Sequence, residues 1–470
     1  MIRKTKIIAT IGPATSSKEM LKALIQKGVT VCRLNFSHLS HEKAKEIISS
    51  IKEINQELHV HTAILADLQG PKIRVGDFEK PINLKKGAEI VFCSKKKKGT
   101  IYIDYNDFAK DVKPKDRVLL DDGKLSLEVV STNKRDTVVL KVVFGGLLYS
   151  RKGVNLPNTT ISLPCLTKKD MNDLEFILTQ KIEWVGLSFV RKAQDVKDLK
   201  QIINSSNSLH KVIAKIEKPE AIKNIDSIIE ASDAIMVARG DLGVEAPPQK
   251  VPVYQKMIVN KCIANSKPVI IATQMLESMT HNSTATRAEV NDVANSVIDG
   301  ADALMLSGET SVGKHPLKVV DTMRNIIRDI ESSEHSISKN AETKELKYDG
   351  RFLTNAICLN AVHIAKQTKA KAIITITYSG FNTIKVSSFR PQAFIYAFTN
   401  NHAILNTLSL VWGVQGFYYE GASTTSQTIK ETKEILKKQK YLRKGDLVVN
   451  IASMPARERG TTNMMKISKI

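Results

Sequence analysis

Short apolar runs alternate with amphipathic stretches along most of the chain. Eight of these runs have the length of a buried strand: 6–12, 29–36, 62–68, 184–190, 211–217, 234–239, 268–274 and 303–308. Repeated strand and helix units indicate a parallel sheet, because parallel strands need a crossover connection. Eight such strands close a barrel. The pattern therefore predicts an α/β protein built on a (β/α)8 TIM barrel.

Two of the helices expected between these runs carry recognisable signals. Pro219 suits a first helical turn. Four isoleucines follow it at helical spacing: Ile222, Ile225, Ile228 and Ile229. Thr286 and Glu289 form a capping box, and Gly300 suits the C-terminal cap. Three valines between them form a predicted apolar stripe: Val290, Val293 and Val297.

The barrel pattern is interrupted between the third and fourth runs. Residues 70–165 carry β-rich runs separated by turn signals, which predicts a small β-barrel domain inserted as a lid. The barrel would then comprise residues 1–69 and 166–335. A polar stretch at 336–350 predicts a linker. Behind it, apolar runs again alternate with helical patterns, so we expect a C-terminal α/β domain of regulatory type at 351–470.

The chain has 470 residues, a net charge of +22 and a pI near 9.6. Such a charge is typical of proteins that bind nucleic acid, an anionic membrane surface or small anionic substrates. The lysines are scattered, and aromatic residues make up only 5%, which disfavours stacking on bases. No apolar run approaches about 20 residues, and the N-terminus lacks the apolar core of a signal peptide. We therefore expect a cytoplasmic protein with no nucleic-acid or membrane partner.

The five cysteines lie far apart, without the close spacing of a metal or redox site: Cys32, Cys93, Cys165, Cys262 and Cys358. This spacing favours buried or inert thiols in a reducing compartment.

Nearly every predicted barrel strand is followed by polar side chains at its carboxyl end. The active site of a (β/α)8 barrel forms at these carboxyl ends. The polar side chains are Arg33, Asn35, Ser37, Asp67, Lys215, Glu217, Arg239, Asp241, Thr273, Ser307 and Glu309. Taken singly, each would cap a helix or form a structural ion pair. Their convergence on one end of the barrel instead predicts a catalytic site.

The residue types in this set predict phosphoryl chemistry. Glu217 and Asp241 offer oxygen ligands only, which suits Mg²⁺ or Mn²⁺. Lys215 and Arg33 add positive charge, which would stabilise a phosphoryl group during transfer.

Two further features at these strand ends suit proton transfer and anion binding. Thr273 and Ser307 could pass a proton to carbon through water. The turn at 240–242, starting with Gly240, opens a helix and offers backbone N–H groups to a carboxylate or phosphate.

Several long segments resemble one family: "TKIIATIGPA", "CRLNFSH", "LDDGKLSLEV", "KIEKPEAI", "IMVARGDLGVEAP", "ATQMLESM", "TRAEVNDVANSVIDGADALMLSGET" and "GTTNMMKI". The chain is similar to pyruvate kinase over essentially its full length. The resemblance implies transfer of phosphate from phosphoenolpyruvate to ADP, which yields pyruvate and ATP in the final step of glycolysis. It also implies a homo-oligomer, with the tetramer that dominates in the family, and a lid that excludes water from the site.

The resemblance assigns roles to individual residues. Glu217 and Asp241 would hold the divalent ion, and Arg33 the substrate phosphate. Lys215 would steady the phosphoryl group and the enolate oxygen. The substrate carboxylate would lie by Thr273, Gly240 and Asp241, and Ser307 would belong to the proton path. Nucleotide contacts would come from His38, Arg74 and Lys169. A monovalent-cation site would be formed by Asn35, Ser37 and Asp67.

One loop departs from the family pattern. The potassium-dependent branch reads close to "DTKGPEIR", whereas this chain reads "DLQGPKIR" at 67–74, with Lys72 in the glutamate position. A lysine ammonium near Asp67 would supply a permanent positive charge and repel a second cation by about 4 kcal/mol at an effective dielectric of 20. We therefore expect the potassium-independent type, in which potassium is not required and Lys72 substitutes for it.

A possible effector site lies in the C-terminal domain. The segment "TYSGFNT" at 377–383 resembles a hydroxyl-rich phosphate loop, with Thr377, Ser379 and Thr383 as possible ligands. Asn382 stands where a hydroxyl is expected, and Arg457 and Arg459 follow in a later loop. A turn without any ligand explains this segment equally well.

Two other functions share part of this sequence pattern. A magnesium-dependent aldolase that uses a pyruvate enolate would share the barrel chemistry, but it would need neither a nucleotide lid nor a C-terminal domain. A basic nucleic-acid-binding protein that has lost catalysis would have lost some of the expected ligands, yet all are present.

Overall fold

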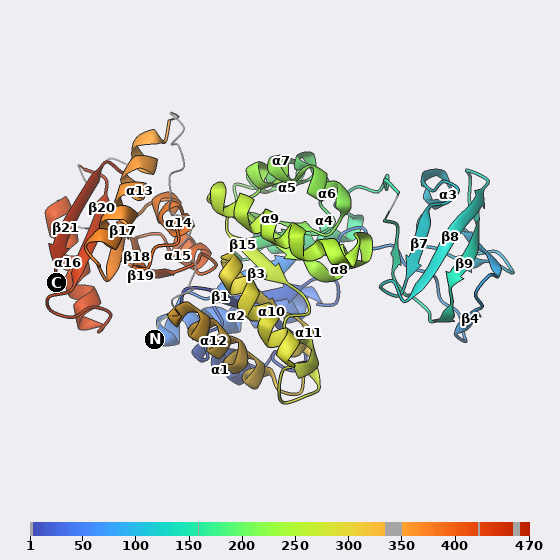
Figure 1. Cartoon of the computed structure of the whole chain (residues 1–470), viewed down its shortest axis with the longest axis horizontal. Coiled ribbons are helices and arrows are strands. Elements are labelled where there is room, and N and C mark those ends of the chain that lie inside the picture. Colours follow the sequence, from blue (N-terminus) through green and yellow to red (C-terminus); the bar gives the residue numbers. More distant parts are fainter. Residues whose placement is uncertain (1–2, 158, 334–349, 422–423, 455–460) are drawn as a thin grey trace.

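The computed structural model describes residues 3–157, 159–333, 350–421, 424–454 and 461–470. Figure 1 shows a central barrel, a β-rich segment on one side of it and a C-terminal α/β unit on the other. The linker predicted at 336–350 lies outside the described residues except for Gly350. Within the described residues, no helix combines the length and apolar character needed to cross a bilayer.

The predicted (β/α)8 barrel is confirmed. Its eight parallel strands close in the order β1-β16-β15-β14-β13-β12-β3-β2. Their bounds are β1 Lys6–Ile11, β2 Val31–Asn35, β3 Ala63–Asp67, β12 Trp184–Leu187, β13 Lys211–Ile216, β14 Ala234–Ala238, β15 Val269–Ala272 and β16 Ala303–Leu306. Each strand is mostly apolar because its residues face either the barrel interior or the surrounding helices.

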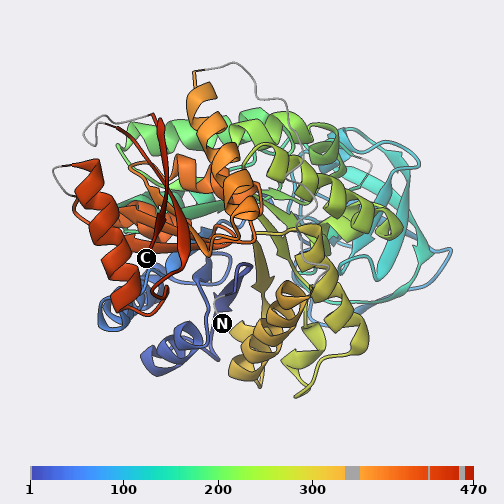
Figure 2. The ribbon, with the colours of Figure 1, turned by 60° about the vertical axis from the view of Figure 1, so that its left-hand side comes forward.

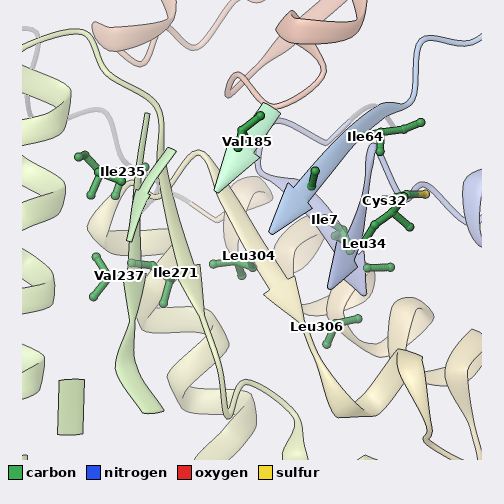
Figure 3. Packing of buried hydrophobic residues seen from close by; sticks show 14 of the residues in the cluster. Ile7, Cys32, Leu34, Ile64, Val185, Ile235, Val237, Ile271, Leu304 and Leu306 are labelled. Carbon is green, nitrogen blue, oxygen red and sulfur yellow. The ribbon is translucent and has the colours of Figure 1, made fainter. Parts of the chain in front are cut away.

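Helices surround the barrel and share one apolar core with the outward faces of its strands (Figure 3), where Ile7, Leu34 and Val185 are buried. The longer helices are α1 Lys18–Gln26, α2 His41–Leu58, α4 Lys168–Thr179, α5 Ala193–Ser205, α9 Val251–Ala264, α10 Arg287–Asp299 and α12 Pro316–Ser332. Shorter ones are α6 Pro219–Lys223, α7 Ile225–Ala231, α8 Arg239–Glu245, η1 Pro248–Lys250, η2 Glu277–Thr280 and α11 Gly308–Ser311.

Two details of the predicted helices need correction. The capping box of Thr286 and Glu289 is present, and Gly300 ends α10 with a φ of 96°. Val290, however, is 38% exposed and lies outside the buried stripe. The single helix expected after Pro219 is two helices, because Asn224 interrupts it and its side-chain amide donates to the Arg191 carbonyl (2.9 Å).

The segment between β3 and β12 folds around an apolar core of its own, which includes Phe92, Phe108 and Leu127. Its elements are β4 Ile82–Leu84, β5 Glu89–Cys93, β6 Ile101–Tyr102, α3 Phe108–Asp111, β7 Arg117–Leu120, β8 Leu125–Thr132, β9 Thr137–Phe144, β10 Gly146–Leu148 and β11 Val154–Asn155. They form a six-stranded sheet, β11-β7-β8-β9-β5-β6, and a two-stranded sheet, β10-β4. The lid expected as a small β-barrel is thus built from these two sheets.

The C-terminal unit is a five-stranded sheet with helices, ordered β19-β18-β17-β20-β21. Its elements are α13 Phe352–Gln367, β17 Ala372–Ile376, α14 Phe381–Ser388, β18 Phe394–Thr399, α15 His402–Leu408, β19 Val414–Tyr418, α16 Thr425–Lys438, β20 Leu447–Ala452 and β21 Met464–Lys469. The unit lies beside the N-terminal end of the barrel (Figure 2). A buried ion pair, Arg390 to Asp302 (2.7 Å), joins the two.

Candidate active site

Four charged residues lie side by side at the carboxyl ends of β2, β3 and β13. They are Arg33, Asp67, Lys215 and Glu217, here called the charged row. Arg33 Nε donates to Asp67 Oδ2 (2.7 Å). Lys215 Nζ lies 3.1 Å from Asp67 Oδ1 and 3.1 Å from Glu217 Oε1. The side chains of Arg33 and Lys215 are 12% and 11% exposed, and both carboxylates only 1%. The row therefore places alternating charges where water screens them little.

Burial and neighbouring charge set the protonation of the row. Burial alone would lower the pKa of Lys215, but the carboxylates of Asp67 and Glu217 outweigh it and raise that pKa. Burial alone would raise the pKa of Asp67, but Lys215 and Arg33 outweigh it and lower that pKa. Lys215 and Asp67 are accordingly both charged at neutral pH.

Glu217 and Asp241 are the two carboxylates that the sequence predicts as ligands of a divalent ion, and they act on each other electrostatically. Burial raises the pKa of Glu217, Lys215 opposes this, and the charge of Asp241 raises it further. Two carboxylates that repel each other fit a cation with oxygen ligands. Within the described residues, no group of three or more acidic, histidine or cysteine side chains could hold a metal. The pair fits Mg²⁺ or Mn²⁺, which keep several ligands from water and substrate phosphate.

The turn after β15 is strained and faces the start of α8. Thr273 has a φ of 71° and Gln274 one of 55°, an uncommon conformation for residues other than glycine. The Thr273 hydroxyl accepts from the Gly240 N–H (2.7 Å), and Arg239 donates to the Thr273 carbonyl (2.8 Å). Strain held by such bonds is common at functional sites. Thr273 and Gly240 thus lie together, as the sequence predicted.

Ser307 lies between β16 and α11. Its backbone N–H donates to Glu309 Oε2 (2.6 Å). Among the described residues its buried hydroxyl has no hydrogen-bond partner, so this hydroxyl is available to a substrate or water. Glu309 also accepts from the Leu276 N–H (3.2 Å), which makes it a structural carboxylate.

The three predicted nucleotide contacts come from different parts of the fold. Burial lowers the pKa of His38, and the charges of Arg74, Lys72 and Lys169 lower it further. These cations therefore share one electrostatic neighbourhood. Lys169 also donates to Asp173 (2.6 Å) and to the Phe36 carbonyl (2.6 Å).

Within the described residues the structure forms no ion pair between Lys72 and Asp67, so Asp67 is neutralised by other cations. Within the described part of the chain no ion pair involves Lys72, and both oxygens of Asp67 face Arg33 and Lys215. Lys72 lines a small pocket with Lys218 and Glu245. Gly70, between β3 and Lys72, has a φ of 70°, and Lys72 Cε lies near Gly153 of the inserted segment.

The residues predicted for a monovalent-cation site lie at or just beyond the ends of the neighbouring strands β2 and β3. Asn35 pairs in register with Asp67, and its side-chain oxygen accepts from the Ser37 N–H (3.1 Å). The charge of Lys72 lowers the pKa of His38, the residue after Ser37. Lys72 therefore influences this segment electrostatically, although it forms no ion pair with Asp67.

The predicted effector ligands are mostly occupied. Thr383 is fully buried, and its hydroxyl bonds to that of Thr375 (2.7 Å), so its expected role as a phosphate ligand is wrong. The Thr377 hydroxyl accepts from the Gly380 N–H (2.9 Å), whereas Ser379 is exposed. The two arginines expected nearby, Arg457 and Arg459, lie outside the described residues.

Sequence reasoning missed residues 188–191, here called the clasp loop. The apolar run at 184–190 was interpreted as one strand, but β12 ends at Leu187. Lys215 Nζ donates to the Ser188 hydroxyl (2.7 Å), and the Phe189 N–H donates to Glu217 Oε2 (2.7 Å). A serine within an apolar run was the available signal.

We expect Gly70→Ala to damage this region more than a glycine substitution elsewhere. Gly70 has a φ of 70°, and an added Cβ would lie 2.8 Å from the Phe189 ring and 2.9 Å from Ser188 Cβ. The variant should lose about 2 to 4 kcal/mol of unfolding free energy and at least about tenfold in kcat. Denaturant unfolding and turnover measure both.

Gly87→Ala is the matched control. Gly87 has a φ of 86° with no atom within 4 Å of an added Cβ, so only backbone strain of about 1 kcal/mol is added. Equal losses in the two variants would contradict the close packing of Gly70 against the clasp loop.

Known proteins resemble the chain throughout. Family models described as the pyruvate kinase barrel domain and the pyruvate kinase alpha/beta domain match residues 2–320 and 355–468. A pyruvate kinase of Geobacillus stearothermophilus is 42% identical over 100% of this chain and 81% of its own length. One of Staphylococcus epidermidis is 40% identical over 99% of this chain and 80% of its own.

A solved structure shares the whole fold. The crystal structure of a pyruvate kinase from Cryptosporidium parvum aligns with a TM-score of 0.92 and 36% identity. The alignment covers 99% of this chain and 96% of that one. The similarity therefore includes barrel, inserted sheets and C-terminal unit.

Proposed function

Because the chain belongs to the pyruvate kinase family, we propose that its charged row is the centre at which phosphate moves from phosphoenolpyruvate to ADP. The chain is a phosphotransferase that yields pyruvate and ATP. The observation that carries the assignment of the site is the placement of Lys215 between two buried carboxylates beside Arg33. A fixed cation in such a site stabilises charge that develops on a transferring phosphoryl group.

We assign binding and charge stabilisation to the row and its neighbours. Arg33 binds the substrate phosphate, and Lys215 faces the phosphoryl group and the enolate oxygen. Glu217 and Asp241 hold a divalent ion, Mg²⁺ or Mn²⁺, which when bound neutralises charge on phosphate oxygens.

The remaining residues orient the substrate and supply the proton. Breaking the phosphorus–oxygen bond leaves an enolate, which becomes pyruvate when its terminal carbon takes up a proton. Thr273 and Gly240, whose hydroxyl and N–H bond to each other in this structure, would exchange that bond for the carboxylate, and the unpartnered hydroxyl of Ser307 belongs to the proton path.

The nucleotide would lie between barrel and lid, in contact with His38, Arg74 and Lys169. We place the lid at 70–165, the barrel at 1–69 and 166–335, and the C-terminal domain at 351–470. Lid closure would exclude water during transfer. We also propose that the chain forms a homotetramer.

An assay of ATP formation tests this function directly. ATP should appear only when phosphoenolpyruvate, ADP and a divalent ion are all present. An aldolase would consume carbonyl substrates without making ATP. A protein that only binds nucleic acid would show salt-sensitive binding without turnover.

We further propose that potassium is not required. Asp67 is already neutralised by Arg33 and Lys215, and Lys72 adds positive charge that acts on His38 beside the monovalent-cation residues. Turnover in tetramethylammonium buffer with Mg²⁺ should stay within about twofold of that in potassium at equal ionic strength. The Lys72→Glu variant should respond to potassium.

The control is Lys86→Glu, which makes the same charge change at an exposed lid position. It should leave the response to potassium unchanged. A wild-type enzyme that needs potassium for most of its turnover would refute the proposal.

A further inference from the structure

The clasp loop, residues 188–191, touches two groups of the proposed catalytic site. Lys215 Nζ donates a hydrogen bond to Ser188 Oγ (2.7 Å) and forms ion pairs with Asp67 Oδ1 (3.1 Å) and Glu217 Oε1 (3.1 Å). Ser188 gives the shortest of these contacts. One residue further, the Phe189 N–H donates to Glu217 Oε2 (2.7 Å).

The same loop holds the chain where it leaves the barrel for the lid, at residues 68–75, here called the first crossing segment. The Ser188 hydroxyl donates to the Leu68 carbonyl (2.7 Å). An ammonium can only donate, so the Ser188 oxygen accepts from Lys215 and its single hydrogen is committed to Leu68. The Phe189 ring packs against Gly70, and the φ of Phe189 is 56°, a strained value for a bulky residue.

The loop also holds the chain where it returns from the lid, at residues 154–165, here called the second crossing segment. The Cys165 thiol donates to the Ser188 carbonyl (3.1 Å). The Arg191 guanidinium donates to the carbonyls of Leu163 (2.8 Å) and Ile161. Two backbone carbonyls are thus held by one planar group, which fixes the direction of the segment.

We propose that Ser188 is a positioning residue for Lys215, and that the clasp loop links the position of the lid to the position of this ammonium. The proposal rests on the assigned role of Lys215. Four short contacts connect both crossing segments with Lys215 and Glu217 through consecutive residues of one loop. A shift of either crossing segment therefore moves the oxygen that holds the catalytic cation.

The first test compares Ser188→Ala with Ser232→Ala in the full-length enzyme. Ser232 is equally buried and also donates to a backbone carbonyl, that of Ile228 (2.7 Å), but does not touch the charged row. Ser188→Ala should lower kcat by about 10- to 100-fold and change the KM for phosphoenolpyruvate less than about threefold. Exchange of pyruvate C3 protons in D2O with Mg²⁺ and ATP should slow similarly, because Lys215 faces the enolate oxygen.

Ser232→Ala should retain kcat and lose the same thermal stability as Ser188→Ala. If both variants have equal kcat, the positioning role is overturned. The proposed function fails separately: a Lys215→Met enzyme with normal turnover would remove the role of Lys215 whatever Ser188→Ala shows.

The second test is a double-mutant cycle between Ser188→Ala and Arg191→Lys. Lysine keeps the charge but cannot span two carbonyls. If Ser188 and Arg191 are coupled, the fold loss of kcat in the double variant should differ from the product of the two single-variant losses by at least about threefold. Arg135→Lys, at an exposed lid position, should combine multiplicatively with Ser188→Ala. A multiplicative result for Arg191 as well would overturn the link to the lid.

Discussion

Lys215→Met is expected to lower kcat by at least about 10³-fold, because the ammonium acts on charge that develops in the transition state. The KM for phosphoenolpyruvate should change much less, since in the proposed site Arg33 and the divalent ion would still bind the phosphate. Steady-state kinetics with both substrates varied measure the two effects. Turnover within tenfold of wild type would exclude Lys215 from the chemistry.

The same variant should also lose stability in a pH-dependent manner. It leaves Glu217 buried without its cation, which costs about 3 kcal/mol. The folded-state pKa of Glu217, already raised by burial, should rise further. A raised pKa favours the folded state below the unfolded pKa, about 4.3, and this advantage is lost as pH rises through the folded pKa. Unfolding free energy should therefore fall as pH rises above about 4.3.

Lys218→Met is the matched control. Lys218 is also a buried lysine, and its ammonium lies 2.7 Å from the buried carboxylate of Glu245. Removing the Lys218 ammonium should lower the unfolding free energy by a comparable amount. It should leave kcat within about tenfold of the wild-type value, because Lys218 lies outside the charged row. Equal losses of turnover in both variants would mean that lost stability, not lost chemistry, explains Lys215→Met.

Glu217→Gln is expected to raise the Mg²⁺ concentration for half-maximal activity by at least about 30-fold and to lower kcat by about 10²-fold. Glutamine is isosteric and can still accept from the Phe189 N–H, so the change removes charge and leaves the backbone contact. Direct Mn²⁺ binding followed by electron paramagnetic resonance separates metal affinity from catalysis.

Glu183→Gln makes the same change at a buried carboxylate at the other end of the barrel. Glu183 accepts from Asn406 (2.9 Å), and burial raises its pKa to about 7. Its replacement should leave the Mg²⁺ titration unchanged. An unchanged titration for Glu217→Gln as well would refute the metal assignment.

The barrel could be predicted because its signal is local. Each strand is a short apolar run that ends in polar residues, and the rule that parallel strands end together brings Arg33, Lys215 and Glu217 to one edge. Short strands and edge strands have a weaker signal. β11 has two residues, and β21 pairs along one side only and has no buried residue, so neither has a strong apolar pattern.

The pairings within the site could not be predicted, because they depend on register and on turns. The ion pair of Asp67 with Lys215 joins the ends of two different strands, β3 and β13, so no local periodicity indicates it. The contact between Ser188 and Lys215 joins residues far apart in sequence. Thr383 looks like an anion ligand in sequence, yet its helix turns it inward against Thr375.

The placement of the lid has a consequence for the order of folding. β3 and β12 are neighbours in the barrel, with Leu65 opposite Trp184, so the ring closes only when the chain has returned from the lid. The two crossing segments bond to each other, since the Val154 N–H donates to the Ile73 carbonyl (2.9 Å). A lid that folds first around its own core brings these ends together and lowers the loop-closure entropy of the barrel. A substitution that destabilises the apolar core of the lid would then slow closure of the barrel, although no barrel residue is changed.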